Sequence, residues 1–144
     1  MRLWSKIALV LAFVPLMASA QYKDLDTALS NLNRGFGSGD PQAIVSGIGD
    51  SEKVQLQFPG LTNDNGFYGR EQASFLLENL FNKVHPSGFE QESARKESAA
   101  SQYHITGMWT IQNAGKAENR ELYITLQQSK NGSWSVVSAR SASK

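Results

Sequence analysis

One amphipathic stretch between Tyr68 and Phe89 constrains the fold more than any other part of the chain. Its apolar residues recur at intervals of three and four, which places them on one stripe of an α-helix. They are Ala73, Leu76, Leu77, Leu80, Phe81 and Val84. Pro86 and Gly88 end the helix. Because strand-like sequence follows, we expect the stripe to pack on a β-sheet, with Leu77 and Leu80 as its anchors.

The first twenty residues have the three parts of a bacterial export signal. Arg2 and Lys6 supply the positive start, residues 7–17 form an apolar run, and Ala18-Ser19-Ala20 forms a small-x-small cleavage signal. The apolar run is too short for a membrane-spanning helix, which needs about 20 residues. We therefore expect cleavage between Ala20 and Gln21, with residues 1–20 removed and residues 21–144 periplasmic or secreted.

Composition narrows the classes of partner. The chain has 144 residues, 40% of them hydrophobic, which suffices for a core, and it has no cysteine for a disulfide or a lipid anchor. The chain has 14 basic and 13 acidic residues. Removal of the signal takes away Arg2 and Lys6, so 12 basic residues remain against 13 acidic ones, a net charge of −1. No basic stripe appears, so a nucleic-acid partner is not expected. No membrane span is expected after cleavage, and no cofactor is indicated.

The rest of the chain reads as two helices, two short strands, the long helix, and then four strands. Asp40 and Pro41 mark a helix start, while Ala114-Gly115 and Asn131-Gly132 are hairpin signals. The expected helices are 23–36 and 41–48, and the expected strands are 54–58, 67–68, 89–95, 102–112, 119–128 and 133–140. This order predicts an α+β roll with the helices on one face of a curved antiparallel sheet.

The two hairpin turns predict the register of the last three strands. A turn at Ala114-Gly115 places Ile105 opposite Ile124, and a turn at Asn131-Gly132 places Leu126 opposite Val137. The resulting inner face holds Tyr103, Ile105, Gly107, Trp109, Ile111, Leu122, Ile124, Leu126, Val137 and Ala139. The outer face holds His104, Thr106, Met108, Tyr123, Thr125, Trp134, Val136 and Arg140. Met108, Tyr123, Trp134 and Val136 make this face unusually aromatic and apolar, and they predict a homodimer or partner interface.

Several short motifs carry a family resemblance. They are Tyr68 through Ala73, Leu80-Phe81, Pro86 through Phe89, Tyr103-His104-Ile105 with Gly107, and Gly115 ahead of Arg120 to Tyr123. Over residues 22–140 they resemble the nuclear-transport-factor-two-like superfamily (a cystatin-like α+β roll), and more narrowly a family of small exported bacterial proteins of unknown function. The resemblance implies one cone-shaped domain whose curved sheet wraps around the long helix. Leu80 and Thr106 depart from the narrower pattern, which has phenylalanine and glycine there.

Enzymes of this superfamily, such as isomerases and dehydratases, use an Asp, His or Tyr inside the cone as acid or base. Here every aspartate precedes residue 65, ahead of the strands that line the cone. His104 is the only strand histidine and the runner-up catalytic candidate, but the register sends it to the outer face. His85 reads as a helix-end residue. Two histidines without paired carboxylates do not indicate a metal site.

Five residues are candidates for contact with a ligand. Tyr68 and Arg70 lie at the mouth of the expected cone, Tyr103 faces inward, and Trp109 opposite Arg120 forms either a cation–π platform or part of the core. The preferred interpretation is an exported non-enzymatic protein that binds a small apolar ligand in the cone or a protein partner. An isomerase- or dehydratase-type enzyme and a structural homodimer are the alternatives. The sequence leaves open whether the cone is open or filled.

Overall fold

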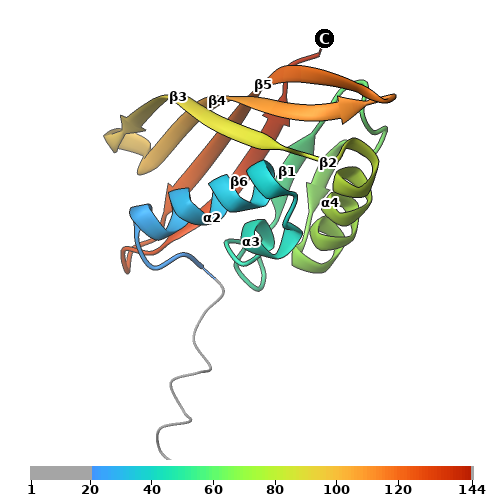
Figure 1. Cartoon of the computed structure of the whole chain (residues 1–144). Coiled ribbons are helices and arrows are strands. Elements are labelled where there is room, and N and C mark those ends of the chain that lie inside the picture. Colours follow the sequence, from blue (N-terminus) through green and yellow to red (C-terminus); the bar gives the residue numbers. More distant parts are fainter. Residues whose placement is uncertain (1–20, 144) are drawn as a thin grey trace, which may run out of the picture.

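Residues 21–143 are described by the computed structural model, and they form one six-stranded sheet with three helices on one of its faces (Figure 1). The helices are α2 (Leu25–Ser38), α3 (Pro41–Val45) and α4 (Arg70–Val84). The strands are β1 (Val54–Gln57), β2 (Gly66–Tyr68), β3 (Gly88–Glu97), β4 (Gln102–Asn113), β5 (Lys116–Gln128) and β6 (Trp134–Ser141). The expected export signal, residues 1–20, lies outside the described residues. Within the described part, no helix is both long and apolar enough to cross a membrane.

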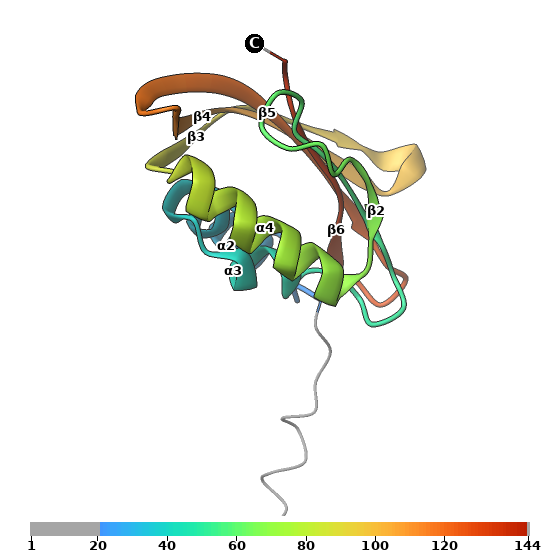
Figure 2. The ribbon, with the colours of Figure 1, turned by 90° about the vertical axis from the view of Figure 1, so that its right-hand side faces the viewer.

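The sheet has the strand order β2-β1-β6-β5-β4-β3 and curves over the helices, as the side view in Figure 2 shows. This confirms the predicted α+β roll. One detail differs from the expectation of a wholly antiparallel sheet: β1 pairs with β6 in parallel, while the other pairs are antiparallel. A parallel pair is possible here because β2, α4, β3, β4 and β5 separate β1 from β6 along the chain, and no short hairpin has to join the two strands.

The stripe predicted for α4 is the face that α4 buries. All six of its apolar residues are buried, and Leu77 is completely inaccessible to solvent, which confirms the two leucine anchors. Glu71 lies in the first turn and Lys83 in the last, each with the sign that the helix dipole favours. The helix ends at His85, which adopts a left-handed conformation and donates its backbone N–H to the Phe81 carbonyl.

Four aromatic rings fill the space between the helices and the concave face of the sheet. Trp109 is 0% exposed, and its ring centroid lies 5.8 Å from those of Phe36 and Phe58 and 6.4 Å from that of Phe81. The Trp109 indole Nε1–H donates to the Phe36 carbonyl at 2.9 Å. Aromatic rings in edge-to-face contact stabilise each other beyond simple burial. The centre of the cone is therefore packed core.

The predicted register is right for one hairpin and wrong in part for the other. Ile105 pairs with Ile124, as expected from the Ala114-Gly115 turn. Leu126, however, pairs with Val136 and not with Val137, because a β-bulge interrupts the ladder between Thr125 and Leu126. The extra residue is Val137 of β6, so the residues between it and the turn face the side opposite to the one expected, while Ile124 still pairs with Ala139 as predicted.

The bulge corrects the placement of two residues expected on the outer face. Trp134 is 5% exposed and Val136 is buried, so both belong to the inner face. Val137, expected inside, is half-buried on the other face. The parity rule assumed a continuous ladder, and the bulge ends that continuity between Ile124 and Val136.

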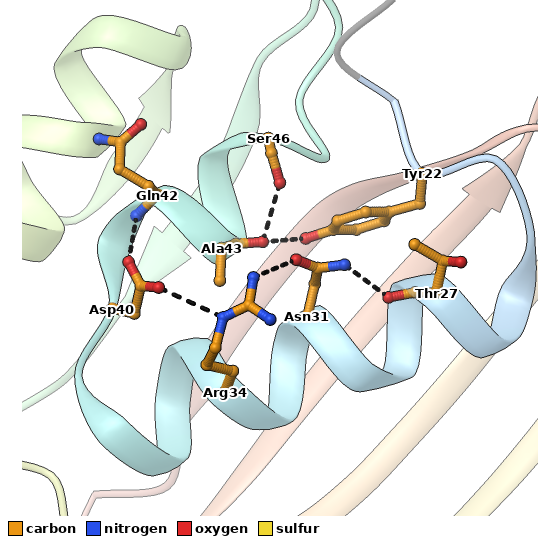
Figure 3. Close-up of polar contacts among 8 residues, drawn as sticks. All are labelled: Tyr22, Thr27, Asn31, Arg34, Asp40, Gln42, Ala43 and Ser46. Atoms are coloured by element: carbon orange, nitrogen blue, oxygen red, sulfur yellow. Dashed lines mark hydrogen bonds and ion pairs between the residues drawn. The ribbon is translucent and has the colours of Figure 1, made fainter.

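The first described residues are tied into the fold. Tyr22 and Trp134 exchange backbone hydrogen bonds of 2.9 and 2.8 Å, and the Tyr22 hydroxyl donates to the Ala43 carbonyl at 2.8 Å (Figure 3). Gly47 leaves room for this ring, since a Cβ there would lie 2.2 Å from a ring carbon. Burial raises the pKa of Tyr22 above its ordinary value, so the hydroxyl remains a donor. The segment directly after the expected cleavage site thus closes the core.

A network of polar side chains near Tyr22 connects α2 to α3. The Arg34 guanidinium donates to the Asn31 side-chain oxygen at 2.7 Å and to the Asp40 carboxylate at 3.3 Å (Figure 3). Asp40 also accepts the Gln42 N–H, as the predicted cap of α3. The side chains of Arg34 and Asp40 are each about half exposed, so these contacts orient the α2–α3 corner and add little stability.

Candidate functional site

A groove runs beside α4, and we name it the α4 groove. It has a volume of about 890 Å³ and lies between residues 60–64, Tyr68 and the side of α4 that runs from Glu71 to Lys83. Leu61, Leu76 and Leu80 form its buried floor. Sites for small molecules typically measure roughly 300–1,000 Å³ and have apolar linings with a few polar groups.

The rim of the α4 groove carries two aromatic side chains. Phe75 is 67% exposed, although it lies on the same helix as the buried stripe, and Tyr68, which also lines the groove, is half-buried. The Phe75 ring and the leucine floor form one contiguous apolar surface, and such surfaces often mark binding sites. Phe67 is also exposed, at 64%, but it does not line the groove.

Polar groups surround this apolar strip. The Lys83 ammonium donates to the Leu61 carbonyl at 2.8 Å, which ties the 60–64 wall to α4. An ammonium has three donors, so Lys83 retains donors for a ligand. Glu71 and Asp64 supply carboxylates on the rim, and Gln72 and Asn79 supply amides. The groove therefore offers an apolar floor together with donors and acceptors at its margin.

The wall of the groove is held from the opposite side by a buried ion pair. Arg120 is 5% exposed, pairs with Glu118, and donates from Nη1 to the Pro59 carbonyl at 2.6 Å. Glu118 accepts a further hydrogen bond from Asn113 at 3.1 Å. Gly60 then turns the chain with a φ of 78°, a conformation that favours glycine. These contacts place the 60–64 segment before any ligand arrives.

The sequence analysis did not identify two residues of this site, Glu118 and Phe75. Glu118 was left outside the expected strand, which was predicted to start at Asn119, whereas β5 begins at Lys116. The spacing of Glu118 and Arg120, two residues apart on one strand face, was a usable signal for an ion pair. Phe75 lies off the apolar stripe of α4, and an exposed phenylalanine beside a buried leucine was the signal for the rim.

The structure separates the five predicted ligand contacts. Only Tyr68 lines the α4 groove. Arg70 donates to the Ile48 carbonyl at 2.9 Å and pairs with Asp50, so it fastens the start of α4 to the segment after α3. Tyr103 packs against Trp134, with ring centroids 6.3 Å apart.

Trp109 and Arg120 do not form the ligand platform that was considered for them. Trp109 is enclosed by aromatic rings, and the Arg120 guanidinium is bound to Glu118 and the Pro59 carbonyl. The cation–π contact on this sheet lies on the outer face, where the Arg140 guanidinium carbon stands 4.6 Å from the centre of the Tyr123 ring. Cross-strand pairing alone did not show that Arg120 is a core residue, because its burial depends on loop 58–65, whose Pro59 carbonyl accepts a hydrogen bond from Arg120.

His104 lies on the outer face, as the register predicted. Its Nε2 is 2.9 Å from Glu97 Oε1, and its Nδ1 is 3.2 Å from Thr125 Oγ1. The order carboxylate, imidazole, hydroxyl resembles a nucleophilic relay, but the three groups lie on the convex side of the sheet and outside the α4 groove. Their evident effect is to join β3, β4 and β5 across the ladder.

The predicted interface residues are divided between two faces. Met108 and Tyr123 are half-buried on the outer face, whereas Trp134 and Val136 belong to the core. The Tyr123 hydroxyl donates to Glu121 at 2.9 Å, and this hydrogen bond raises the pKa of Tyr123. An interface role for Met108 and Tyr123 stays a prediction. Within residues 21–143 there is also no cluster of three or more His, Asp or Glu side chains that suits a metal ion.

Comparison with known proteins gives a family and a fold. Residues 29–140 match the family described as "Domain of unknown function (DUF4783)". A DUF4783 protein from Bacteroides uniformis has a similar structure, with a TM-score of 0.64, 16% identity, and coverage of 80% of this chain and 95% of that one. A DUF4783 protein from Bacteroides fragilis has a TM-score of 0.61 and 20% identity, over 79% of this chain and 96% of that one.

Two further groups of structures extend the fold comparison. An NTF2-like protein from Anabaena variabilis matches with a TM-score of 0.62 and 13% identity, over 83% of this chain and 87% of that one. A hypothetical protein from Catenulispora acidiphila with a ketosteroid isomerase-like fold also matches, and its structure was solved in complex with trimethylamine. The TM-score is 0.61 at 10% identity, over 81% of this chain and 85% of that one. At these identities the likeness shows the fold. No curated protein matches the sequence.

Proposed function

The chain belongs to the DUF4783 family of domains of unknown function, and from this premise we propose that it is an exported, non-enzymatic protein that binds a small molecule with an apolar body in the α4 groove. The observation that carries the proposal is the exposed Phe75 ring beside a buried leucine floor, in a cavity of about 890 Å³. An apolar floor, an aromatic rim and polar groups at the margin together are typical of sites for small molecules.

The groove fits a ligand with an apolar body and a polar end. Leu61, Leu76 and Leu80 offer the apolar floor, and the Phe75 ring gains burial only when something covers it. Lys83 lies at the far end of the α4 side of the groove and has donors beyond its bond to Leu61. A carboxylate, sulfonate or carbonyl at one end of the ligand would meet this ammonium.

The engagement of the titratable groups supports a binding role over catalysis. Glu118 faces the interior but is paired with Arg120, and His104 is bonded to Glu97 and Thr125 on the outer face. Acid–base catalysis needs a titratable group within reach of a bound substrate. The groove carboxylates, Glu71 and Asp64, are exposed on its rim. The enzyme alternative would therefore have to use these rim carboxylates, Tyr68 or Lys83.

Dye binding tests the site. We expect the domain beginning at Gln21 to enhance the fluorescence of 1-anilinonaphthalene-8-sulfonate, which combines an aromatic body with an anionic end. Phe75→Ser should weaken the affinity by about 4–12-fold, which corresponds to about half of the ~1.5–3 kcal/mol for full burial of a phenylalanine. Phe67→Ser is the matched control, because Phe67 is equally exposed outside the groove. Equal affinities of the two variants would refute the site.

Export has its own test. Expression of the full chain in a Gram-negative host should yield a periplasmic or secreted protein whose intact mass corresponds to a start at Gln21. The reason is the small-x-small signal at residues 18–20 that follows an apolar run. A mass that retains Met1, with the protein in the cytoplasmic fraction, would contradict the proposed location and leave the α4 groove proposal intact.

A further inference from the structure

The edge of the sheet formed by β3 has unused hydrogen-bonding groups. β3 is the last strand in the order, it is ten residues long, and residues 90–97 are all exposed. In an antiparallel pair, alternate residues of an edge strand direct their N–H and C=O groups away from the neighbour. In the described part of the chain, β4 is the only strand that pairs with β3. The other edge strand, β2, has only three residues.

A second cavity opens beside this edge, and we name it the α2–β3 pocket. It measures about 540 Å³, and its lining includes Leu29 and Ser30 of α2, residues 89–91 of β3, and Ile105 of β4. Ile105 is buried, while Leu29 is only partly covered by the core. An apolar surface thus lies directly under the free edge.

Helix α2 covers only the beginning of β3. A Cβ placed on Gly37 would lie 3.4 Å from the Phe89 backbone nitrogen, so helix and strand are in contact there. From Glu90 onward the strand residues are exposed. The free part of the edge therefore begins where the α2–β3 pocket lies, and Figure 1 shows β3 and β4 extending past α2.

We propose that the β3 edge binds an extended segment of a partner protein as a seventh strand, with one apolar side chain of that segment in the α2–β3 pocket. In this mode of recognition, main-chain hydrogen bonds supply affinity, and pockets for alternate side chains supply specificity. The surface has both parts: an exposed edge over residues 90–97, whose alternate residues direct backbone groups outward, and a cavity with an apolar floor beside it.

A second copy of this chain does not fit the pocket. The β3 residues opposite Gly107, Ile105 and Tyr103 face the concave side, and they are Gln91, Ala94 and Lys96. An added copy of β3 would present an amide, a methyl group and an ammonium to an apolar floor. Phe89, the one large apolar residue of β3, is packed in its own core, 6.4 Å from the Phe36 ring.

The edge is also protected against unselective pairing. The ladder shifts between Gln91 and Ser93, which leaves Glu92 without a partner in β4, and charged side chains follow at Arg95 and Lys96. Bulges and charges are common devices that prevent edges from associating with one another. A partner segment must therefore bring the apolar anchor that this edge lacks.

Selection of peptides tests the proposal. A random heptapeptide library is selected on the domain that starts at Gln21, and the recovered peptides are synthesised. We expect the recovered peptides to share one apolar residue at a fixed position, with polar residues on either side of it. N-methylation of alternate peptide nitrogens should weaken binding at least tenfold, while N-methylation of the intervening nitrogens should have little effect, because only one set faces β3.

Variants of α2 locate the bound peptide. Leu29→Asp and Ser30→Tyr should each weaken binding at least tenfold, the first by charging the pocket and the second by filling it. Ser30 is exposed, so its variant is not expected to affect folding. Leu25→Asp is the matched control, because Leu25 is partly buried on α2 outside the pocket. Phe75→Ser should leave peptide affinity unchanged, which separates this site from the α4 groove.

Three outcomes would overturn the proposal. The first is a library that yields no enriched peptide. The second is a set of peptides whose affinity is insensitive to Ser30→Tyr and to N-methylation. The third is a concentration-dependent dimer, seen by analytical ultracentrifugation, that Ser30→Tyr dissociates, because the occupant of the edge would then be a second copy of the chain.

Discussion

Trp109→Ala is expected to lower the free energy of unfolding by about 3–5 kcal/mol, measured by urea denaturation of the domain that starts at Gln21. The Trp109 ring is completely buried among three other aromatic rings, so its removal leaves a cavity. It also leaves the buried Phe36 carbonyl without its hydrogen-bond donor. Phe75→Ala is the control, since its side chain is exposed, and we expect it to change stability by less than about 0.5 kcal/mol.

The same experiment decides whether the cone is filled. A cost for Trp109→Ala below about 1 kcal/mol would mean that the indole borders open space, as in a ligand-lined cone, and that the packed aromatic centre is wrong. The free energy of unfolding of Trp109→Phe should lie between those of the wild type and the alanine variant, because phenylalanine retains a ring but lacks the N–H that donates to the Phe36 carbonyl. An equal loss for both variants would assign the effect to the hydrogen bond alone.

Arg120→Ala has the second large expected effect, a loss of about 3–5 kcal/mol, because it leaves the Glu118 carboxylate buried without its cation. It also removes the donor that holds the Pro59 carbonyl. Urea denaturation measures the first effect, and dye affinity at the α4 groove measures the second. We expect both stability and affinity to fall.

A double variant separates these two effects. Glu118→Leu with Arg120→Leu should recover much of the stability lost in Arg120→Ala, since apolar side chains of similar volume often replace a buried ion pair without cost. It should not recover dye affinity, because the Pro59 carbonyl still lacks its donor. Recovery of both would mean that Arg120 does not position the 60–64 wall, and a negligible cost of Arg120→Ala would mean that the pair is hydrated.

Local patterns predicted the elements of this fold well because burial follows periodicity directly. Helix α4 buries the six residues of the three-and-four stripe, and the β4–β5 hairpin has the register that its two-residue turn implies. In both cases the residues that determine the structure are neighbours along the chain or across one turn. The resemblance to the wider superfamily rested on these same core and turn positions, and the fold comparisons agree with it.

The errors came from features that no local pattern encodes. The bulge at Thr125 and Leu126 changes the facing of Trp134 and Val136, and a bulge depends on the curvature of the whole sheet. The α4 groove depends on contacts that are distant in sequence: Arg120 holds the Pro59 carbonyl 61 residues away, and Lys83 holds the Leu61 carbonyl 22 residues away. The sequence predicted an apolar ligand in the cone or a protein partner and left open whether the cone is filled; in the structure, aromatic side chains occupy its centre.

Two-dimensional NMR of the ¹⁵N-labelled domain, titrated with 1-anilinonaphthalene-8-sulfonate, tests the binding site most directly. Our account predicts the largest shifts at the backbone amides of residues 61–64, Phe75 and Asn79, which line the α4 groove. It predicts little change at the indole N–H of Trp109, which is buried and bonded to the Phe36 carbonyl. A large shift of that indole signal, with the amides of the groove unchanged, would place the ligand inside the cone and contradict the account.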